Sequence, residues 1–375
     1  MKTVYTNAVI VDGGKLTENI DVVTENGVIT ELAPRGGASG EVIDLDGAYL
    51  SAGWIDLHCH GGDGYEFIDG TKQAVTAAAK IHALHGTRVL YPTISACDAA
   101  AMTAALEAIE AAGADCPLFI AGVHLEGPYL SPEMSGAQSD SCIRPPDEAE
   151  YRALVARFGA LICRWTYAPE CDDGSFLRFL GENGIKASIG HSAAVYDEVK
   201  AALAGGADLV THLYSCTSTV TRRSGFRRPG IVESAFLMDD MFVEIIADGC
   251  HLPEEMIRLI LKIKGSRRVC AVTDAIRPAG MTAAQAPADA PYIIEDGVAK
   301  LADRSAFAGS IATTDRLLRV LTRCGISLAE AVRMMTETPA KAMGLTDLGA
   351  VAPGRKALFT VFDKDLNVLP VCNRQ

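Results

Sequence analysis

The sequence lacks the features that mark secreted, membrane-spanning and nucleic-acid-binding proteins. Its 11 cysteines include no CxxC pair and no regular spacing, so we expect reduced thiols rather than a disulfide framework. No apolar run reaches the roughly 18 residues of a membrane span, and the N-terminus lacks the basic-then-apolar pattern of a signal peptide. The net charge of −13 argues against binding to nucleic acid or anionic membranes. These absences predict a cytoplasmic protein that acts on neither nucleic acid nor membranes.

A glycine-rich dinucleotide loop is also absent, which disfavours an open doubly wound sheet. Helix-like and strand-like stretches alternate from Trp54 onward, and about eight β/α repeats fit there, which predicts a (β/α)₈ TIM-type barrel. The expected helices cover residues 72–84, 98–112, 148–158, 174–183, 194–204, 254–264, 312–324 and 327–334.

The two terminal segments do not show this alternation of helices and strands. They contain short strand-like stretches separated by glycine-containing turns. We expect residues 1–51 and 346–375 to build one small, antiparallel β-sandwich domain. Residues 52–345 would then form the barrel.

Histidine is scarce, and its placement is informative. Of eight histidines, most stand at the ends of apolar strand-like runs. His58 and His60 are two residues apart, as are His124 and Glu126, so each pair would project from one face of a strand. His191, His212, His251 and Asp274 follow further runs. In a barrel, the carboxyl ends of the strands meet at the active-site face, so these side chains should converge.

Nitrogen and oxygen ligands of this kind suit a divalent metal. We predict one or two ions per chain, with Zn²⁺ favoured and Fe²⁺, Mn²⁺ or Co²⁺ as alternatives, held by His58, His60, Glu126, His191, His212 and Asp274. Metal ions make water a nucleophile near neutral pH, and Asp274 would be the general base and then the acid for the leaving amine. The alternative for Glu126 and Asp274 is a role in capping turns or helices.

Two other groups of residues have simpler explanations. His82 and His85, one turn apart on an expected helix, are interpreted as surface or packing residues, and Cys59 as part of the core. Four arginines lie within residues 221–230 of this acidic chain. They form either a solvated or subunit-contact loop, or an anion site for one or two of them.

Seven short motifs follow one another along the barrel segment: 53–62 GWIDLHCHGG, 124–130 HLEGPYL, 190–192 GHS, 211–214 THLY, 248–251 DGCH, 273–275 TDA and 308–310 AGS. In sequence and order they resemble the N-acetylglucosamine-6-phosphate deacetylases of the amidohydrolase superfamily. The LEGP motif is specific to that branch, whereas His-x-His marks only the superfamily.

The resemblance implies hydrolysis of the N-acetyl amide of a phosphorylated amino sugar. It implies Glu126, His191 and His212 as ligands of the main metal, Asp274 as general base and His251 as a substrate contact. It also implies a homodimer in which an arginine of the partner subunit meets the phosphate, and Arg227 best matches that arginine.

The sequence departs from the family at positions that face the substrate. Ser215 and Cys216 begin a Ser-Cys-Thr stretch where Asn-Ala-Met is usual, and Ala137-Gln138 stands where Ala-His is typical. N-acetylglucosamine 6-phosphate is the favoured substrate. The galactosamine epimer, an unphosphorylated sugar, another amide, and a catalytically silent sugar-phosphate-binding barrel remain alternatives.

Overall fold

The core of the protein is a closed barrel of parallel strands. The computed structural model describes residues 2–282, 285, 290, 292–304 and 307–370. The barrel strands, in spatial order, are β8 (Trp54–Cys59), β11 (Thr87–Ile94), β13 (Val123–Glu126), β14 (Ile162–Tyr167), β15 (Lys186–Ile189), β16 (Leu209–Val210), β19 (Phe242–Ile246) and β20 (Val269–Val272). A parallel bridge between Cys59 and Ala275 joins the last strand to the first. The predicted TIM-type barrel is therefore confirmed, and the open sheet is excluded.

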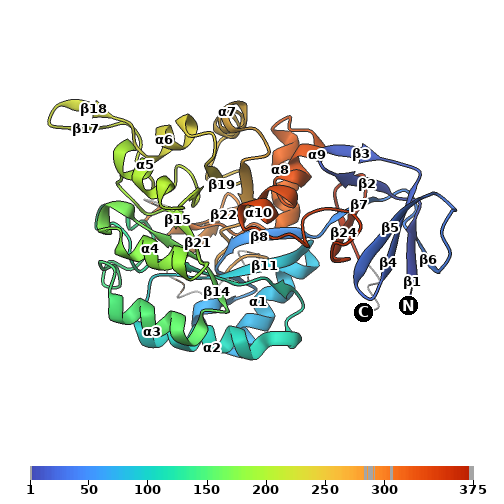
Figure 1. Cartoon of the computed structure of the whole chain (residues 1–375), viewed down its shortest axis with the longest axis horizontal. Coiled ribbons are helices and arrows are strands. Elements are labelled where there is room, and N and C mark those ends of the chain that lie inside the picture. The colour runs from blue at the N-terminus through green and yellow to red at the C-terminus, as the bar shows by residue number, and fades with distance from the viewer. Residues whose placement is uncertain (1, 283–284, 286–289, 291, 305–306, 371–375) are drawn as a thin grey trace.

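Helices surround the barrel (Figure 1). They are α1 (Lys72–Leu84), α2 (Ala99–Ala112), α3 (Glu148–Phe158), α4 (Ser175–Glu182), α5 (Tyr196–Ala204), α6 (Ile231–Leu237), α7 (Glu254–Lys264), α8 (Thr314–Arg323), α9 (Leu328–Arg333) and α10 (Glu337–Ala342). The hydroxyl of Thr71 and the carboxylates of Asp98 and Asp147 cap α1, α2 and α3 by accepting backbone N–H bonds. The short helices α6 and α10 were not predicted.

A small β domain lies at one end of the barrel and is built from the N-terminal and C-terminal segments of the chain (Figure 1). One sheet has the order β5 (Val28–Pro34), β4 (Ile20–Glu25), β1 (Lys2–Thr6), β6 (Glu41–Asp44). The other has the order β25 (Val368–Leu369), β24 (Phe359–Phe362), β7 (Tyr49–Ala52), β2 (Val9–Asp12), β3 (Lys15–Thr17). Its assembly from both termini agrees with the prediction. The expectation of purely antiparallel pairing is wrong, because β1 pairs β6 and β2 pairs β7 in parallel.

Three smaller β elements lie outside the barrel strands. They are the pair β9 (Gly61–Gly62) and β10 (Tyr65–Glu66), the hairpin β17 (Thr221–Arg223) and β18 (Phe226–Arg228), and the sheet β21 (Tyr292–Glu295), β22 (Val298–Leu301) and β23 (Phe307–Gly309). A two-residue strand, β12 (Phe119–Ile120), also pairs with β11. The β17–β18 hairpin projects from the barrel at the end opposite the small β domain (Figure 1). Among the described helices, none is both long and apolar enough to cross a membrane.

Candidate metal centre and active site

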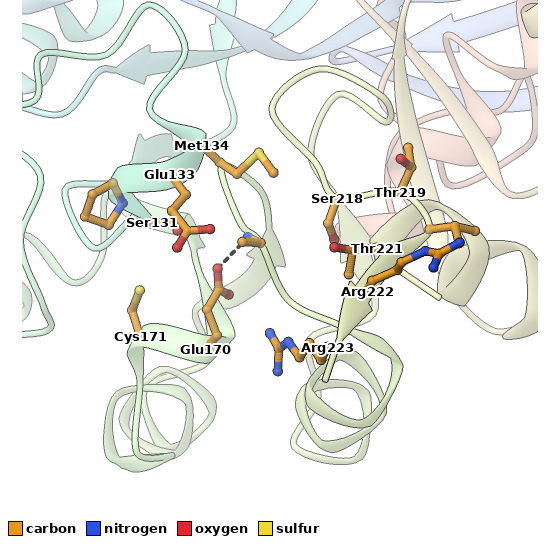
Figure 2. Close-up of a pocket in the computed structure, with 13 residues that line it drawn as sticks. Ser131, Glu133, Met134, Glu170, Cys171, Ser218, Thr219, Thr221, Arg222 and Arg223 are labelled. Carbon is orange, nitrogen blue, oxygen red and sulfur yellow. Dashed lines mark hydrogen bonds between the residues drawn. The ribbon is translucent and has the colours of Figure 1, made fainter. Parts of the chain in front are cut away.

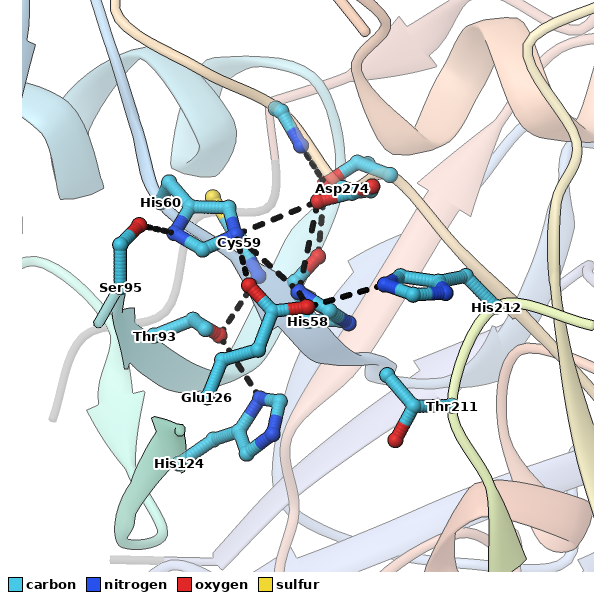
Figure 3. Close-up of polar contacts among 12 residues, drawn as sticks. His58, Cys59, His60, Thr93, Ser95, His124, Glu126, Thr211, His212 and Asp274 are labelled. Atoms are coloured by element: carbon cyan, nitrogen blue, oxygen red, sulfur yellow. Dashed lines mark hydrogen bonds and ion pairs between the residues drawn. The ribbon is translucent and has the colours of Figure 1, made fainter. Parts of the chain in front are cut away.

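The strand ends bring four histidines and two carboxylates together. Figure 3 shows His58, His60 and His212 around Glu126 and Asp274. Glu126, the last residue of β13, lies at the middle of the group and is 1% exposed. Its Oε1 atom is 2.9 Å from Nε2 of His212, 3.1 Å from Nε2 of His191 and 3.4 Å from Nε2 of His58. Its Oε2 atom is 3.2 Å from Nε2 of His60. The two carboxylate oxygens therefore face different histidines, as in a carboxylate shared by two ions.

Asp274 closes the other side of the group. Its Oδ1 atom is 3.3 Å from Nε2 of both His58 and His60. The Nε2 atoms of these two histidines lie 3.1 Å apart. A cation between such nitrogens and the carboxylates would satisfy all of their lone pairs at once.

The second ring nitrogen of each histidine is held by the protein, which is the usual arrangement for metal ligands. Each Nδ1 atom has an oxygen partner: Ser95 Oγ at 2.9 Å for His60, Met134 O at 2.9 Å for His191, Ser215 O at 3.0 Å for His212 and Glu244 Oε2 at 3.4 Å for His58. The carbonyl partners require a protonated Nδ1, so in the neutral ring Nε2 carries the lone pair that can bind a metal. The donor set therefore fits a divalent metal.

The backbone conformation also marks these residues as part of a functional site. His191, His212 and Asp274 have φ angles of 47°, 27° and 46°, in the left-handed region that non-glycine residues rarely adopt. Strained backbone of this kind clusters at functional sites, where the surrounding structure stabilises it.

The electrostatic field at the centre favours positive charge. Burial opposes ionisation of Glu126, but the neighbouring imidazoles outweigh it and hold the carboxyl pKa well below its usual value. Burial lowers the pKa of His60 and His191, yet the carboxylates Asp274 and Glu126 raise the pKa of His60 to about 9, and Glu126 raises that of His191 to about 10. The same field would attract a metal cation.

A cavity of about 1050 Å³ opens above this centre. Its lining includes His60, Glu126, His191, His212 and Asp274, and also the predicted substrate residues Ala137, Gln138, Ser215, Cys216 and His251. His58 lies beneath the others and is fully buried. The cavity is therefore large enough for a monosaccharide derivative directly above the candidate metal ligands.

Two of the predicted substrate residues are oriented by the protein. The backbone N–H of Ala96 donates to Gln138 Oε1 at 2.9 Å, and this bond turns the Gln138 amide nitrogen toward Glu126 Oε2, 2.6 Å away. His251 Nδ1 lies 2.8 Å from Asp248 Oδ2. Burial lowers the pKa of His251, but the Asp248 carboxylate outweighs it and leaves that pKa raised.

Other strand-end and helix histidines lie outside the centre. His124 is held between the hydroxyls of Thr93 (3.2 Å) and Thr166 (2.7 Å), so its ring nitrogens are engaged elsewhere. His82 is fully buried with Nε2 2.9 Å from Gly61 O, so it is a packing residue, and the surface alternative is wrong for it.

Another group of possible metal ligands, Asp56, Cys59 and His82, lies outside this centre and is also fully buried. Asp56 accepts hydrogen bonds from Thr273 and from the backbone of His58, so its oxygens already have partners. Cys59 packs against His82 on the side of β8 away from His58 and His60, as predicted for a core residue.

The arginine-rich segment is an exposed hairpin, and Arg227 does not line the cavity above the candidate metal ligands. Arg227 and Arg222 lie directly opposite each other across the hairpin, and within the described residues neither has an acidic partner. Arg223, by contrast, pairs with Glu198 at 2.9 Å.

A second cavity, of about 710 Å³, lies between the β17–β18 hairpin and the segments at 131–134 and 170–171 (Figure 2). Arg222 and Arg223 of the arginine-rich segment line it, whereas the predicted metal ligands do not. Glu170 accepts hydrogen bonds there from the Ser192 hydroxyl and the Ala193 backbone, so this wall supports the turn that carries His191.

Sequence reasoning missed the residues that hold the ligands. Glu244 and Arg164 form a buried ion pair below His58. Burial raises the pKa of Glu244, but Arg164 outweighs it and lowers that pKa to about 2. The feature of the sequence that could have revealed them is a single charged residue inside each of two otherwise uncharged strands, β14 and β19.

Comparison with known proteins agrees with the fold. The amidohydrolase family model matches residues 49–373. The N-acetylglucosamine-6-phosphate deacetylase of Lysinibacillus sphaericus is 28% identical, over 98% of this chain and 95% of the relative. The N-acetylgalactosamine-6-phosphate deacetylase of Shewanella sp. (strain ANA-3) is 30% identical, over 97% of this chain and 93% of the relative. The crystal structure of N-acetylglucosamine-6-phosphate deacetylase from Pasteurella multocida superposes with a TM-score of 0.89 at 29% identity, over 98% of this chain and 97% of that one. The chain belongs to the amidohydrolase family.

Proposed function

We propose that the protein hydrolyses the N-acetyl amide of an amino sugar phosphate, with N-acetylglucosamine 6-phosphate as the favoured substrate. The observation that carries the proposal is the convergence of four imidazole Nε2 atoms on Glu126 and Asp274 at the floor of a cavity of about 1050 Å³. The named relatives, which act on sugars of this class, support the same assignment.

The site would hold one or two divalent ions, with Zn²⁺ favoured. Glu126, His191 and His212 would hold the main ion, and His58, His60 and Asp274 a second one. Bound there, a divalent ion supplies Lewis acidity toward the acetyl carbonyl and lowers the pKa of water.

Asp274 would move the proton. Burial raises the pKa of Asp274, but the neighbouring imidazoles of His58, His60 and His212 outweigh it and keep the carboxylate ionised, so that it would take a proton from the attacking water. It then donates this proton to the amide nitrogen as the C–N bond breaks, so that acetate and a free amine leave.

The substrate would be oriented by residues on the cavity wall. His251, with Nδ1 committed to Asp248, offers Nε2 to a sugar hydroxyl or the acetyl group. Gln138 offers its amide N–H groups near Glu126, and Ala137, Ser215 and Cys216 would shape the remainder of the wall.

The phosphate would be bound across a homodimer. Arg227 lies on the projecting hairpin, outside the cavity of its own chain. Two facing arginines without acidic partners would repel each other unless an anion lies near them. We therefore propose that Arg227 contacts the phosphate of a substrate bound to the partner subunit.

We also propose that the protein works in the cytoplasm. The ten cysteines described by the structure are all free thiols, and free thiols persist in reducing compartments.

The galactosamine epimer is the second candidate substrate. It is supported by the Shewanella relative, and by Gln138, Ser215 and Cys216 on the cavity wall, where the sequence departs from the family pattern.

Acetate release from both 6-phosphates and both unphosphorylated sugars, with metal content determined on the same sample, tests the proposal. We expect turnover of one phosphorylated epimer by protein that holds one or two ions. Metal-loaded protein that releases no acetate from any of the four would refute it.

A further inference from the structure

The interior of the barrel contains an ion pair directly below the candidate metal centre. Arg164 on β14 and Glu244 on β19 are both 0% exposed and contact each other through Nη1 and Oε1. Barrel interiors are usually filled by branched apolar side chains, and a buried ion pair contributes little to stability compared with apolar residues of the same size. The pair therefore calls for an explanation other than stability.

Arg164 is fixed in place by neighbours from several strands. Its guanidinium donates to Leu57 O at 3.0 Å, to Ser188 Oγ at 3.0 Å and to Thr211 Oγ1 at 2.9 Å, in addition to Glu244. A planar fork with all its nitrogens engaged cannot rotate, so it fixes the position of the Glu244 carboxylate.

The second oxygen of Glu244 faces the metal centre. Oε2 is 3.4 Å from Nδ1 of His58 and accepts the backbone N–H of His212 at 3.3 Å. One carboxylate thus contacts the ring of one candidate ligand and the backbone of another, and both of these ligands face Oε1 of Glu126.

We propose that Glu244, held by Arg164, is a positioning residue that fixes His58 with Nε2 directed at the metal and so sets the affinity of the site for metal. The proposal rests on the metal centre of the proposed function, but not on the identity of the substrate. A carboxylate partner orients a ligating imidazole and fixes its tautomer, and loss of such a partner typically weakens metal binding about 10- to 100-fold.

Two double variants separate the hydrogen bond from the buried charge. Arg164→Met with Glu244→Met removes both charges and the acceptor for His58. Arg164→Met with Glu244→Gln also removes both charges but keeps an oxygen that can accept from Nδ1. Replacing both partners together avoids leaving one buried charge unpaired. Arg88→Met is the matched control, because within the described part of the chain this barrel arginine bonds only to the carbonyls of Phe359, Ala83 and Thr87.

Zn²⁺ affinity, measured by competition with a chelator, is the readout, and the visible spectrum of the Co²⁺-loaded protein reports ligand geometry. We expect the Met/Met variant to bind Zn²⁺ about 10- to 100-fold more weakly than wild type, and the Met/Gln variant to recover most of the loss. The Arg88→Met control should bind like wild type. Melting temperatures of all variants show whether a loss of Zn²⁺ affinity merely follows a loss of fold stability.

Wild-type affinity in the Met/Met variant, or equal weakening in both double variants, would overturn the proposal. If the Met/Met variant does not fold, Glu244→Asp is tested in its place. This variant keeps the charge beside Arg164 but withdraws the oxygen from His58. Unchanged Zn²⁺ affinity in Glu244→Asp would overturn the proposal. A protein that binds Zn²⁺ as expected but releases no acetate would contradict the proposed function and leave this inference standing.

Discussion

Replacing Asp274 by asparagine separates proton transfer from the architecture of the site. Asparagine has the same shape as aspartate and tolerates the left-handed φ of 46° found at this position, so the backbone bond from Asp274 N to His58 O should persist. What is lost is the charge 3.3 Å from the Nε2 atoms of His58 and His60, and with it the proposed proton acceptor.

The expected loss follows from the role of a general base. Positioned proton transfer contributes about 100- to 10,000-fold in rate, or about 3–5 kcal/mol of transition-state stabilisation. We therefore expect kcat for acetate release to fall by that factor in Asp274→Asn. Metal content should stay near the wild-type value, because four histidines and Glu126 remain.

The assay compares kcat and metal content on the same preparations, at saturating substrate and Zn²⁺. Asp315→Asn is the matched control, because Asp315 also pairs with a histidine, His85 at 3.1 Å, but lies outside the cavity. A kcat for Asp274→Asn within tenfold of wild type, at equal metal content, would show that Asp274 is not the base.

Three further predictions test other parts of the site and fold. Glu126→Ala should lower bound metal to less than half of the wild-type content after dialysis, because both carboxylate oxygens face ligand nitrogens; full content would contradict the shared-carboxylate assignment. Arg227→Ala should raise KM for the phosphorylated sugar about tenfold and leave the unphosphorylated sugar unaffected, whereas Arg223→Ala on the same hairpin should change neither. Burial raises the pKa of Asp315, but His85, Thr313 and Arg319 outweigh it and hold that pKa below its usual value. The carboxylate therefore stabilises the fold above about pH 4 and loses this effect as the pH falls. Asp315→Asn should accordingly lower the melting temperature at pH 7 more than at pH 3, and equal losses would refute the pairing.

The grouping of candidate ligands at the strand ends could be predicted because two simple rules apply there together. Side chains two apart share a face of a strand, and parallel barrel strands all end at one rim, so His58, His60 and Glu126 could be grouped from sequence alone. The expected helix starts at residues 72 and 148 agree with the structure, in which Thr71 and Asp147 cap these helices.

Other parts of the fold could not be read in the same way. The parallel pairing of β1 with β6 and of β2 with β7 depends on contacts between distant segments, which periodicity does not encode. Arg164 and Glu244 each stand alone in an apolar strand, and only the closed barrel shows that their charges meet. A lone charge within a buried strand is thus a useful signal, but its partner has to come from the structure.

The departures from the family pattern need not disturb the metal centre, because the loops hold the ligands largely through backbone atoms. His191 and His212 are anchored by the carbonyl oxygens of Met134 and Ser215, whose side chains play no part in these bonds. The side chain of Ser215 can therefore change without moving a candidate ligand. Gln138 and Cys216 are the exceptions, since the Gln138 amide contacts Glu126 and the Cys216 thiol contacts the His191 ring. A substitution at 215 should consequently alter which sugar is accepted while metal affinity stays constant, whereas a substitution at Gln138 or Cys216 should change both.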